Sequence, residues 1–139
     1  MALSDALHDF FRAARRARGR AARQASDDSV SLAQYHLLEP LLDGPLTNRE
    51  LAELAGVSSP TATRMVDVLL GRDLVTRIED LADRRAVVIS LTETGRKAVS
   101  EKTREYDKAR RRIAAALEPG EQAVAADLLR RLAVVIEEL

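Results

Sequence analysis

The feature that most constrains the fold is a pair of short amphipathic segments, separated by a glycine, within residues 46–91. In the first segment, Thr47 and Glu50 have the spacing of a capping box, in which the hydroxyl accepts from an amide and the carboxylate reaches back. Gly56 follows the apolar residues and can adopt the left-handed conformation that ends a helix. The sequence therefore predicts a short helix between Thr47 and Gly56.

A second helix is predicted immediately after this glycine. Ser58 or Ser59 can act as its N-cap, and Pro60 falls in the first turn, where its missing N–H costs nothing. Spacings of three and four residues place an apolar set on one face: Ala62, Met65, Val66, Leu69 and Leu70. The other face carries small polar and charged residues: Thr61, Thr63, Arg64 and Asp67. The two segments together predict a helix-turn-helix with a polar outward face on its second helix.

Two β-rich runs, residues 74–78 and 86–91, follow the second helix, and the polar segment between them is too short for another element. They predict a β-hairpin, which in this position is the wing of a winged helix. Arg84 and Arg85 lie near its tip. A guanidinium is always charged and sheds water more readily than an ammonium, so arginine suits a narrow, electronegative minor groove. The hairpin and the helix-turn-helix together predict a unit that binds double-stranded DNA.

The order of short motifs through this stretch resembles the MarR family of winged-helix regulators. The motifs are LT-x-x-E-L-A, G-V-S, Thr-Arg, L-V-x-R, D-R-R and S-L-T-x-x-G. The D-R-R at residues 83–85 and the L-T-x-x-G at residues 91–95 recur at the family's spacing, and the resemblance covers essentially the whole chain. It implies a homodimeric repressor that binds a pseudo-palindromic operator through a recognition helix in the major groove and a wing in the minor groove.

The resemblance also implies which residues contact DNA. Helix N-termini suit phosphate because their free N–H groups attract anions, and Asp83 would orient Arg85 toward the minor groove. The candidate DNA-binding set is Thr47, Asn48, Ser58, Ser59, Pro60, Thr61, Thr63, Arg64, Arg77, Asp83, Arg84 and Arg85. Family members commonly respond to small aromatic or anionic compounds, which implies an effector cleft lined here by Phe11, Tyr35 and His36. Taken singly, Phe11 and Tyr35 also fit an ordinary core.

Catalytic and metal-binding functions find no support in the sequence. The 139 residues include no cysteine, and neither His8 nor His36 is near an acidic pair with ligand spacing. No glycine-rich phosphate-binding motif is present. Aromatic residues make up 3% of the chain, too few for stacking on single-stranded nucleic acid. We therefore expect no enzyme activity, no cofactor and no metal.

Charge is distributed unevenly along the chain although the net charge is zero. Residues 43–97 hold eight basic and nine acidic side chains, a net charge of −1, whereas residues 1–26 hold six arginines and two aspartates, a net charge of +4. Affinity for phosphates requires local basic charge rather than a basic total. We expect four arginines to face DNA together: Arg64, Arg77, Arg84 and Arg85. Three acidic residues should point elsewhere: Glu50, Glu53 and Asp73.

Helical patterns flank the winged-helix stretch on both sides. They predict a helix over residues 2–24, a second over 31–42 that Pro40 should kink or end early, and a charged helix from after Gly95 to about residue 117. A broadly apolar helix is predicted over residues 121–139.

The terminal helices carry more apolar surface than one small unit can cover, which predicts a twofold dimer with a shared core. The fold class is mainly α with a small β-hairpin wing, in one domain over residues 1–139. Residues 1–30 and 96–139 form the predicted dimerisation region, and residues 31–95 form the winged helix-turn-helix. No apolar run approaches a membrane span and Met1 leads directly into a helical pattern, so a cytoplasmic protein without membrane contact is expected.

A second hypothesis keeps the winged helix but assigns it to protein–protein contact without DNA sequence specificity. Under this alternative, Arg84 and Arg85 are solvated charges on a hairpin, and Asp83 has no functional role beside Arg85. The wing residues therefore separate the two hypotheses.

Overall fold

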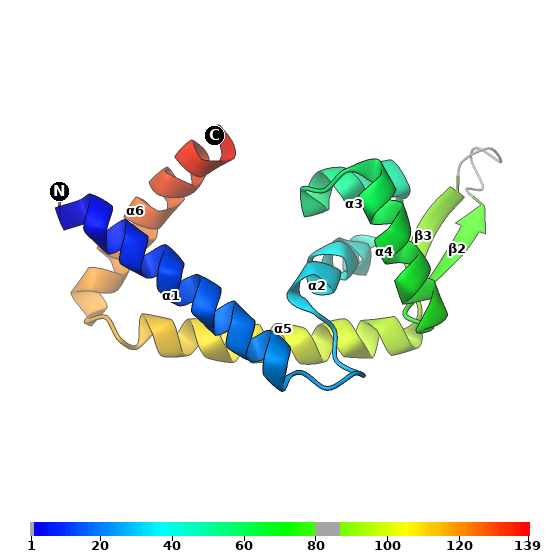
Figure 1. Cartoon of the computed structure of the whole chain (residues 1–139), viewed down its shortest axis with the longest axis horizontal. Coiled ribbons are helices and arrows are strands. Elements are labelled where there is room, and N and C mark those ends of the chain that lie inside the picture. Colours follow the sequence, from blue (N-terminus) through cyan, green and yellow to red (C-terminus); the bar gives the residue numbers. More distant parts are fainter. Residues whose placement is uncertain (1, 80–86) are drawn as a thin grey trace. The chain divides into compact units, whose positions relative to one another are not determined.

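The computed structural model describes residues 2–79 and 87–139, which divide into two compact units, 1–100 and 101–139. The elements of the first unit are α1 (Ala2–Gln24), α2 (Leu32–Leu38), the 3-10 helix η1 (Glu39–Asp43), β1 (Leu46–Thr47), α3 (Asn48–Ala55), α4 (Ser59–Gly71), β2 (Val75–Glu79) and β3 (Val87–Leu91). Helix α5 (Glu93–Ala114) begins in this unit and continues into the second, which also holds α6 (Pro119–Glu137) (Figure 1).

Helix α2 is shorter than the predicted helix over residues 31–42. Ser31 is its N-cap, with a capping box to Gln34, and the α-helix ends at Leu38. Pro40 then stands in the first turn of η1, because proline removes a donor and cannot continue an α-helix. The early end expected at Pro40 is confirmed, and the segment continues as a 3-10 helix.

The helix-turn-helix forms as the sequence predicts. The Thr47 hydroxyl accepts from the Glu50 N–H at 3.2 Å, and the Glu50 carboxylate accepts from the Thr47 N–H at 3.4 Å, so the capping box of α3 is complete. Gly56 ends α3 in the left-handed conformation, with φ of 67°. Ser58, rather than Ser59, is the N-cap of α4. These caps set where each helix starts and therefore which residues begin α4.

The sheet is antiparallel with the strand order β1-β3-β2. The predicted hairpin is present: Val75 pairs with Leu91 and Arg77 with Ile89. A third strand, β1, adds Leu46 opposite Ile89 on the other edge of β3. Strand β2 packs beside α4 (Figure 1). Beyond Val75 the residues of β2 are exposed, so this strand lies at the surface of the unit, as the predicted wing requires.

The N-terminus of α5 lies against the turn between α4 and β2. The Thr92 hydroxyl accepts from the Gly95 N–H at 2.9 Å and donates to the Asp73 carbonyl at 2.6 Å. A Cβ on Gly95 would collide with the Leu74 carbonyl oxygen. The sequence predicted that this helix starts after Gly95, but α5 begins at Glu93 and Gly95 lies inside its first turn. This close backbone approach gives the T-x-x-G part of the motif at 91–95 a physical reason.

The core of the first unit comes from α2, η1, α3, α4, the sheet and the start of α5. Its largest fully buried side chains are Leu37, Leu38, Leu41, Leu51, Leu69, Val66, Val75 and Val99. Helix α1 has the predicted bounds, but none of its residues, all of them described, is buried. Phe11 is 50% exposed, so the interpretation of Phe11 as a core residue is wrong for this single chain.

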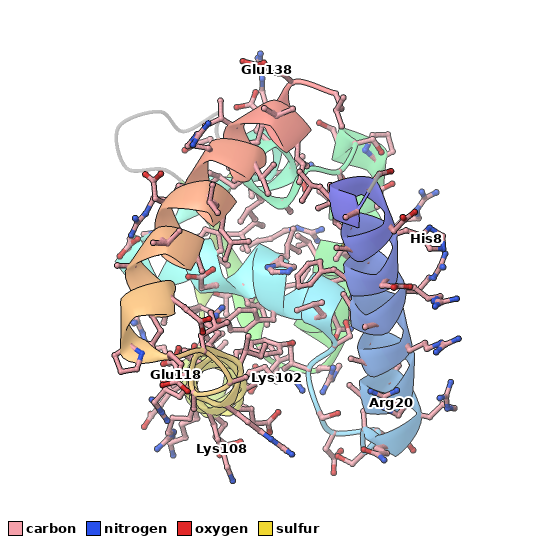
Figure 2. The ribbon with its side chains drawn as sticks, turned by 90° about the vertical axis from the view of Figure 1, so that its left-hand side faces the viewer. His8, Arg20, Lys102, Lys108, Glu118 and Glu138 are labelled. Atoms are coloured by element: carbon pink, nitrogen blue, oxygen red, sulfur yellow. The ribbon has the colours of Figure 1, made fainter. Side chains whose placement is uncertain are left out.

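The second unit is built around the turn from α5 to α6. The Gln122 side chain donates to the carbonyls of Ala114 and Leu117, at 3.0 and 3.3 Å. Glu118 and Glu121 form a capping box, so α6 begins at Pro119, two residues before the predicted start. Figure 2 labels Glu118 at this turn and Glu138 at the far end of α6. None of the residues of α6, a fully described helix, is buried.

Candidate nucleic-acid interface

Helix α4 has one buried and one exposed face. Ala62, Val66 and Leu69 are buried in the core of the first unit. Thr63, Arg64 and Asp67 are exposed. This is the division that the sequence predicted, and it follows from the burial of one stripe of an amphipathic helix. The exposed face of α4 is therefore free to contact a partner.

A chain of hydrogen bonds links the polar side chains at the start of α4. The Ser58 hydroxyl accepts from the Thr61 N–H at 3.3 Å and donates to the Thr61 hydroxyl at 2.9 Å. Arg64 donates to the same Thr61 oxygen at 3.3 Å. Ser59 and Pro60 are the first two residues of the helix, and both are exposed. The geometry places Ser58, Thr61 and Arg64 together at the helix N-terminus, where N–H groups attract anions.

Three other predicted contact residues have partners within the protein. The Thr47 hydroxyl belongs to the capping box of α3. The Asn48 amide donates to the Ser59 carbonyl at 3.2 Å, which ties the start of α3 to the start of α4. The Thr63 hydroxyl donates to the same carbonyl at 3.0 Å. These bonds give Thr47, Asn48 and Thr63 structural tasks; their contacts with DNA stay predictions.

Arg77, at the base of the wing, forms an ion pair with Asp67 of α4 at 2.6 Å. Sequence reasoning placed Asp67 on the outward face but gave it no partner, because the two residues belong to different elements. Among the acidic residues expected to point elsewhere, Glu50 is held in its capping box and Glu53 pairs with Arg49 at 3.4 Å. The remaining wing candidates, Asp83, Arg84 and Arg85, lie outside the described residues.

Arg72 connects two segments of the first unit, and the sequence did not indicate this role. At the C-terminus of α4, its guanidinium donates to the carbonyls of Asp28 and Ser29, at 2.8 and 3.2 Å, and to the Gln34 side chain at 3.1 Å. These partners lie 38 to 44 residues away in the sequence, so no local pattern could identify them. Arg72 fastens the loop between α1 and α2 to the end of α4.

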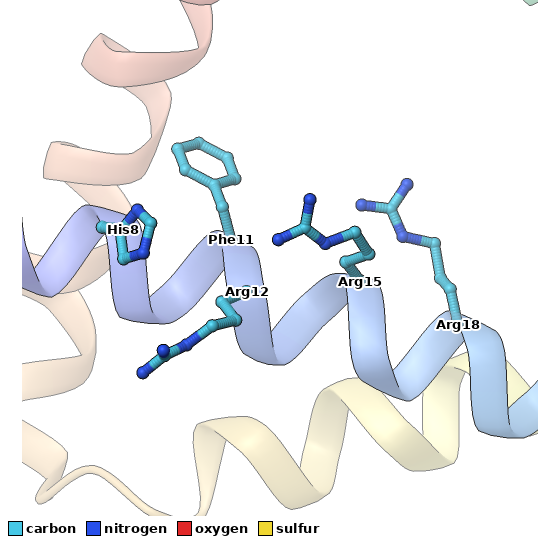
Figure 3. A pocket seen from close by; sticks show the side chains of 5 residues that line it. All are labelled: His8, Phe11, Arg12, Arg15 and Arg18. Carbon is cyan, nitrogen blue, oxygen red and sulfur yellow. The ribbon is translucent and has the colours of Figure 1, made fainter.

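The residues predicted to bind an effector have different surroundings. Tyr35 is 4% exposed and belongs to the core. His36 is exposed, and the centroids of its ring and the Tyr35 ring are 5.8 Å apart in an edge-to-face arrangement. Phe11 lines an open hollow on α1 together with His8, Arg12, Arg15 and Arg18. Phe11, Arg15 and Arg18 point to one side of α1, and Arg12 points to the other (Figure 3). Neither Tyr35 nor His36 lines this hollow.

The fold and this interface define a winged helix-turn-helix protein. Its sequence matches the model of the MarR family over residues 30–87. It is 33% identical over 90 residues to an uncharacterized HTH-type transcriptional regulator, YwaE of Bacillus subtilis, covering 65% of this chain and 53% of YwaE. It is 36% identical over 74 residues to the HTH-type transcriptional repressor NicR of Pseudomonas putida, covering 52% of this chain and 47% of NicR. The chain thus spans about half the length of these curated relatives.

Solved structures match over nearly the whole chain. BpsR of Bordetella bronchiseptica is 25% identical with a TM-score of 0.72, covering 93% of this chain and 98% of BpsR. FabT of Streptococcus pneumoniae, solved with DNA, is 20% identical with a TM-score of 0.84, covering 99% of this chain and 96% of FabT, a likeness that shows the fold. The chain thus resembles the regulators of the MarR family, and the curated relatives named here are transcriptional regulators. Within the described part of the chain, no helix combines the length and apolar character needed to cross a membrane.

Proposed function

We propose that this protein is a transcriptional repressor that binds double-stranded DNA in a sequence-specific manner as a homodimer. The observation that carries the proposal is the exposed face of α4, where Thr63 and Arg64 stand free of the core while Val66 and Leu69 anchor the opposite face. A helix with this division can enter the major groove, whose base edges present a distinct donor and acceptor pattern for each base pair.

The residues at the start of α4 divide into two roles. Ser58, Ser59 and Pro60 surround the helix N-terminus, which suits a backbone phosphate and fixes the register of the protein on DNA. Thr61, Thr63 and Arg64 lie just inside the helix and are the candidates for base contacts. The hydrogen bond from Arg64 to Thr61 supports this assignment, because it holds a flexible arginine near one position before DNA is bound.

The second groove contact is assigned to the wing. Arg85, oriented by Asp83, would enter the minor groove, as the family resemblance implies, and Arg84 lies beside it in the sequence. Minor-groove contacts respond to groove width more than to base identity, since A·T and T·A present the same acceptors there. Loss of Arg85 should therefore weaken binding to every duplex.

The dimer is assigned to the terminal regions, residues 1–30 and 96–139, with residues 31–95 as the winged helix-turn-helix. Large apolar side chains of α6 are exposed at helical spacing in the single chain: Val124, Leu128 and Val135 on one stripe, with Leu129 and Ile136 beside it. Contiguous exposed apolar surface of this kind marks a protein interface. A second copy supplies an identical face, as twofold symmetry requires.

A small aromatic or anionic effector is a further part of the proposal. DNA binding by BpsR, which is 25% identical to this chain, is regulated by 6-hydroxynicotinic acid. Phe11 offers an exposed ring beside Arg15 and Arg18, which suits an aromatic anion. Tyr35 and His36 remain the second set of candidates.

Two arginine substitutions test the proposal against a protein-docking role. Duplexes are first selected from random DNA with the purified protein. Arg64→Ala should cost about 1–3 kcal/mol on the selected duplex and relax the base preference. Arg85→Ala should weaken selected and random duplexes together and lower the salt slope by about one counterion. Arg49→Ala, on α3, is the matched control. If no duplex is enriched, or if neither arginine matters, the protein-docking alternative is favoured.

A further inference from the structure

The ion pair between Asp67 and Arg77 joins the two elements that carry the proposed DNA contacts. Asp67 belongs to α4 and Arg77 to β2 at the base of the wing, and their charged atoms are 2.6 Å apart. The side chains are 58% and 45% exposed, respectively. Because the pair is accessible rather than buried, the guanidinium can exchange Asp67 for another anion that approaches this face.

Asp67 shares the exposed face of α4 with the candidate base-reading residues. It follows Arg64 by three residues and Thr63 by four, spacings that place side chains on the same side of a helix. All three side chains are exposed. A carboxylate on a face that meets DNA would repel phosphates, and Arg77 offsets that charge. The same bond occupies Arg77, a cation that could otherwise neutralise a phosphate.

We propose that Asp67 restrains sequence-independent DNA binding by holding Arg77 in this ion pair. The inference rests on the proposed function and deepens it. Binding to arbitrary DNA depends on the number of phosphates that cations neutralise, each contributing about 0.9 to the slope of log affinity against log salt concentration. An arginine held by a neighbouring carboxylate must first leave it, so Asp67 lowers the contribution of Arg77. Loss of the Asp67 charge releases that arginine.

The test is the Asp67→Asn variant of the full chain, measured with a random-sequence duplex at several salt concentrations. Its affinity should rise about fivefold, the upper range for an exposed ion pair, and its salt slope should steepen by about 0.9. The same substitution in an Arg77→Gln background should leave the affinity within about twofold of Arg77→Gln alone. Thermal unfolding should stay near that of the parent protein because both side chains are largely exposed.

Asp107→Asn is the matched control. Asp107 pairs with Arg110 at 2.9 Å on α5, with side-chain exposures of 46% and 65%. It removes the same charge from another exposed Asp–Arg pair, which belongs to the second unit and to neither α4 nor the wing. An equal rise in this control would assign the effect to net charge and overturn the proposal.

Three further results would also overturn the inference. They are an unchanged random-duplex affinity for Asp67→Asn, a rise that persists without Arg77, and a loss confined to the selected duplex. The last would make Asp67 a direct base contact. A parent protein that binds no duplex at all would instead overturn the proposed function, and this inference with it.

Discussion

Residues 30–99 and the terminal helices differ in whether a single chain buries their apolar side chains. Every buried hydrophobic residue among the described positions lies between Val30 and Val99, whereas α1 and α6 contain none. Yet the apolar spacing of α6 is as regular as that of α4. An amphipathic pattern therefore predicts a face to be covered but does not identify what covers it.

The difference has a thermodynamic consequence. The winged helix buries a core within one chain, so we expect its folding not to need a second chain. In the proposed dimer, the terminal helices gain most of their stabilisation from the second chain, which makes that stabilisation depend on protein concentration. We expect the two regions to respond differently to substitution.

The largest effect is expected from a charge on the apolar stripe of α6. Leu128→Glu removes a side chain whose burial contributes about 1.5–3 kcal/mol, and a twofold dimer loses it twice. The dimer should therefore weaken by at least about 100-fold, with selected-duplex affinity lost at nanomolar concentration. Sedimentation velocity measures the change. Glu137→Gln, on the same helix, should leave the dimer intact, and a parent protein that is monomeric at micromolar concentration would contradict this account.

Gly95→Ala should produce the second largest effect, within the self-sufficient region. Its Cβ would collide with the Leu74 carbonyl oxygen, and the backbone there is held by Thr92. The free energy of unfolding should fall by about 2–3 kcal/mol in urea denaturation, as for other overpacked sites. In Gly71→Ala, by contrast, the new Cβ meets nothing within 4 Å, so that variant should be as stable as the parent. Equal stability of the two variants would show that α5 does not pack as described.

Arg72→Met should have a smaller effect at the boundary between α1 and the winged helix. It removes hydrogen bonds to the Asp28 and Ser29 carbonyls and to Gln34, at an expected cost of about 1–2 kcal/mol. Amide hydrogen exchange in residues 25–31 should accelerate while exchange in α4 stays slow. Unchanged exchange in this loop would show that the Arg72 hydrogen bonds do not hold the loop in place.

Thr47 substitutions give the smallest effect and separate capping from phosphate contact. Thr47→Ala should lower stability by about 1 kcal/mol through loss of the N-cap. Thr47→Asp keeps a capping oxygen but puts a negative charge beside the Glu50 carboxylate, to which the Thr47 hydroxyl donates at 3.0 Å, so its stability should resemble that of Thr47→Ala. Its duplex binding should be weaker than that of Thr47→Ala if Thr47 lies near phosphate. Full DNA affinity in Thr47→Asp would leave this residue a purely structural role.

Local signals predicted local structure well. The bounds of α1, the caps at Thr47, Gly56 and Ser58, and the early helix end at Pro40 all depend on residues within one or two turns. The shape of the candidate interface followed, because the buried stripe of α4 fixes which side chains point outward. The family resemblance was confirmed by the comparisons.

Features that depend on distant residues were not predicted. Strand β1 is two residues long, too short for any periodic pattern, and exists because it pairs with β3. The hydrogen bonds of Arg72 and the ion pair of Asp67 are made with residues of other segments. From the sequence, Phe11 fitted either an effector cleft or an ordinary core, and in the single chain it is 50% exposed.

The central claim is that the terminal helices join two copies so that two α4 helices bind one inverted repeat. The most direct test is the mass of the complex on a selected duplex, measured by native mass spectrometry, with and without about five extra base pairs between the half-sites. Half-sites should lie about 34–36 Å apart, one helical turn, and half a turn of extra DNA rotates one away from its helix. We predict two chains on the original duplex and at least about 100-fold weaker binding after the insertion. One chain per duplex, bound equally well to both DNAs, would contradict the claim.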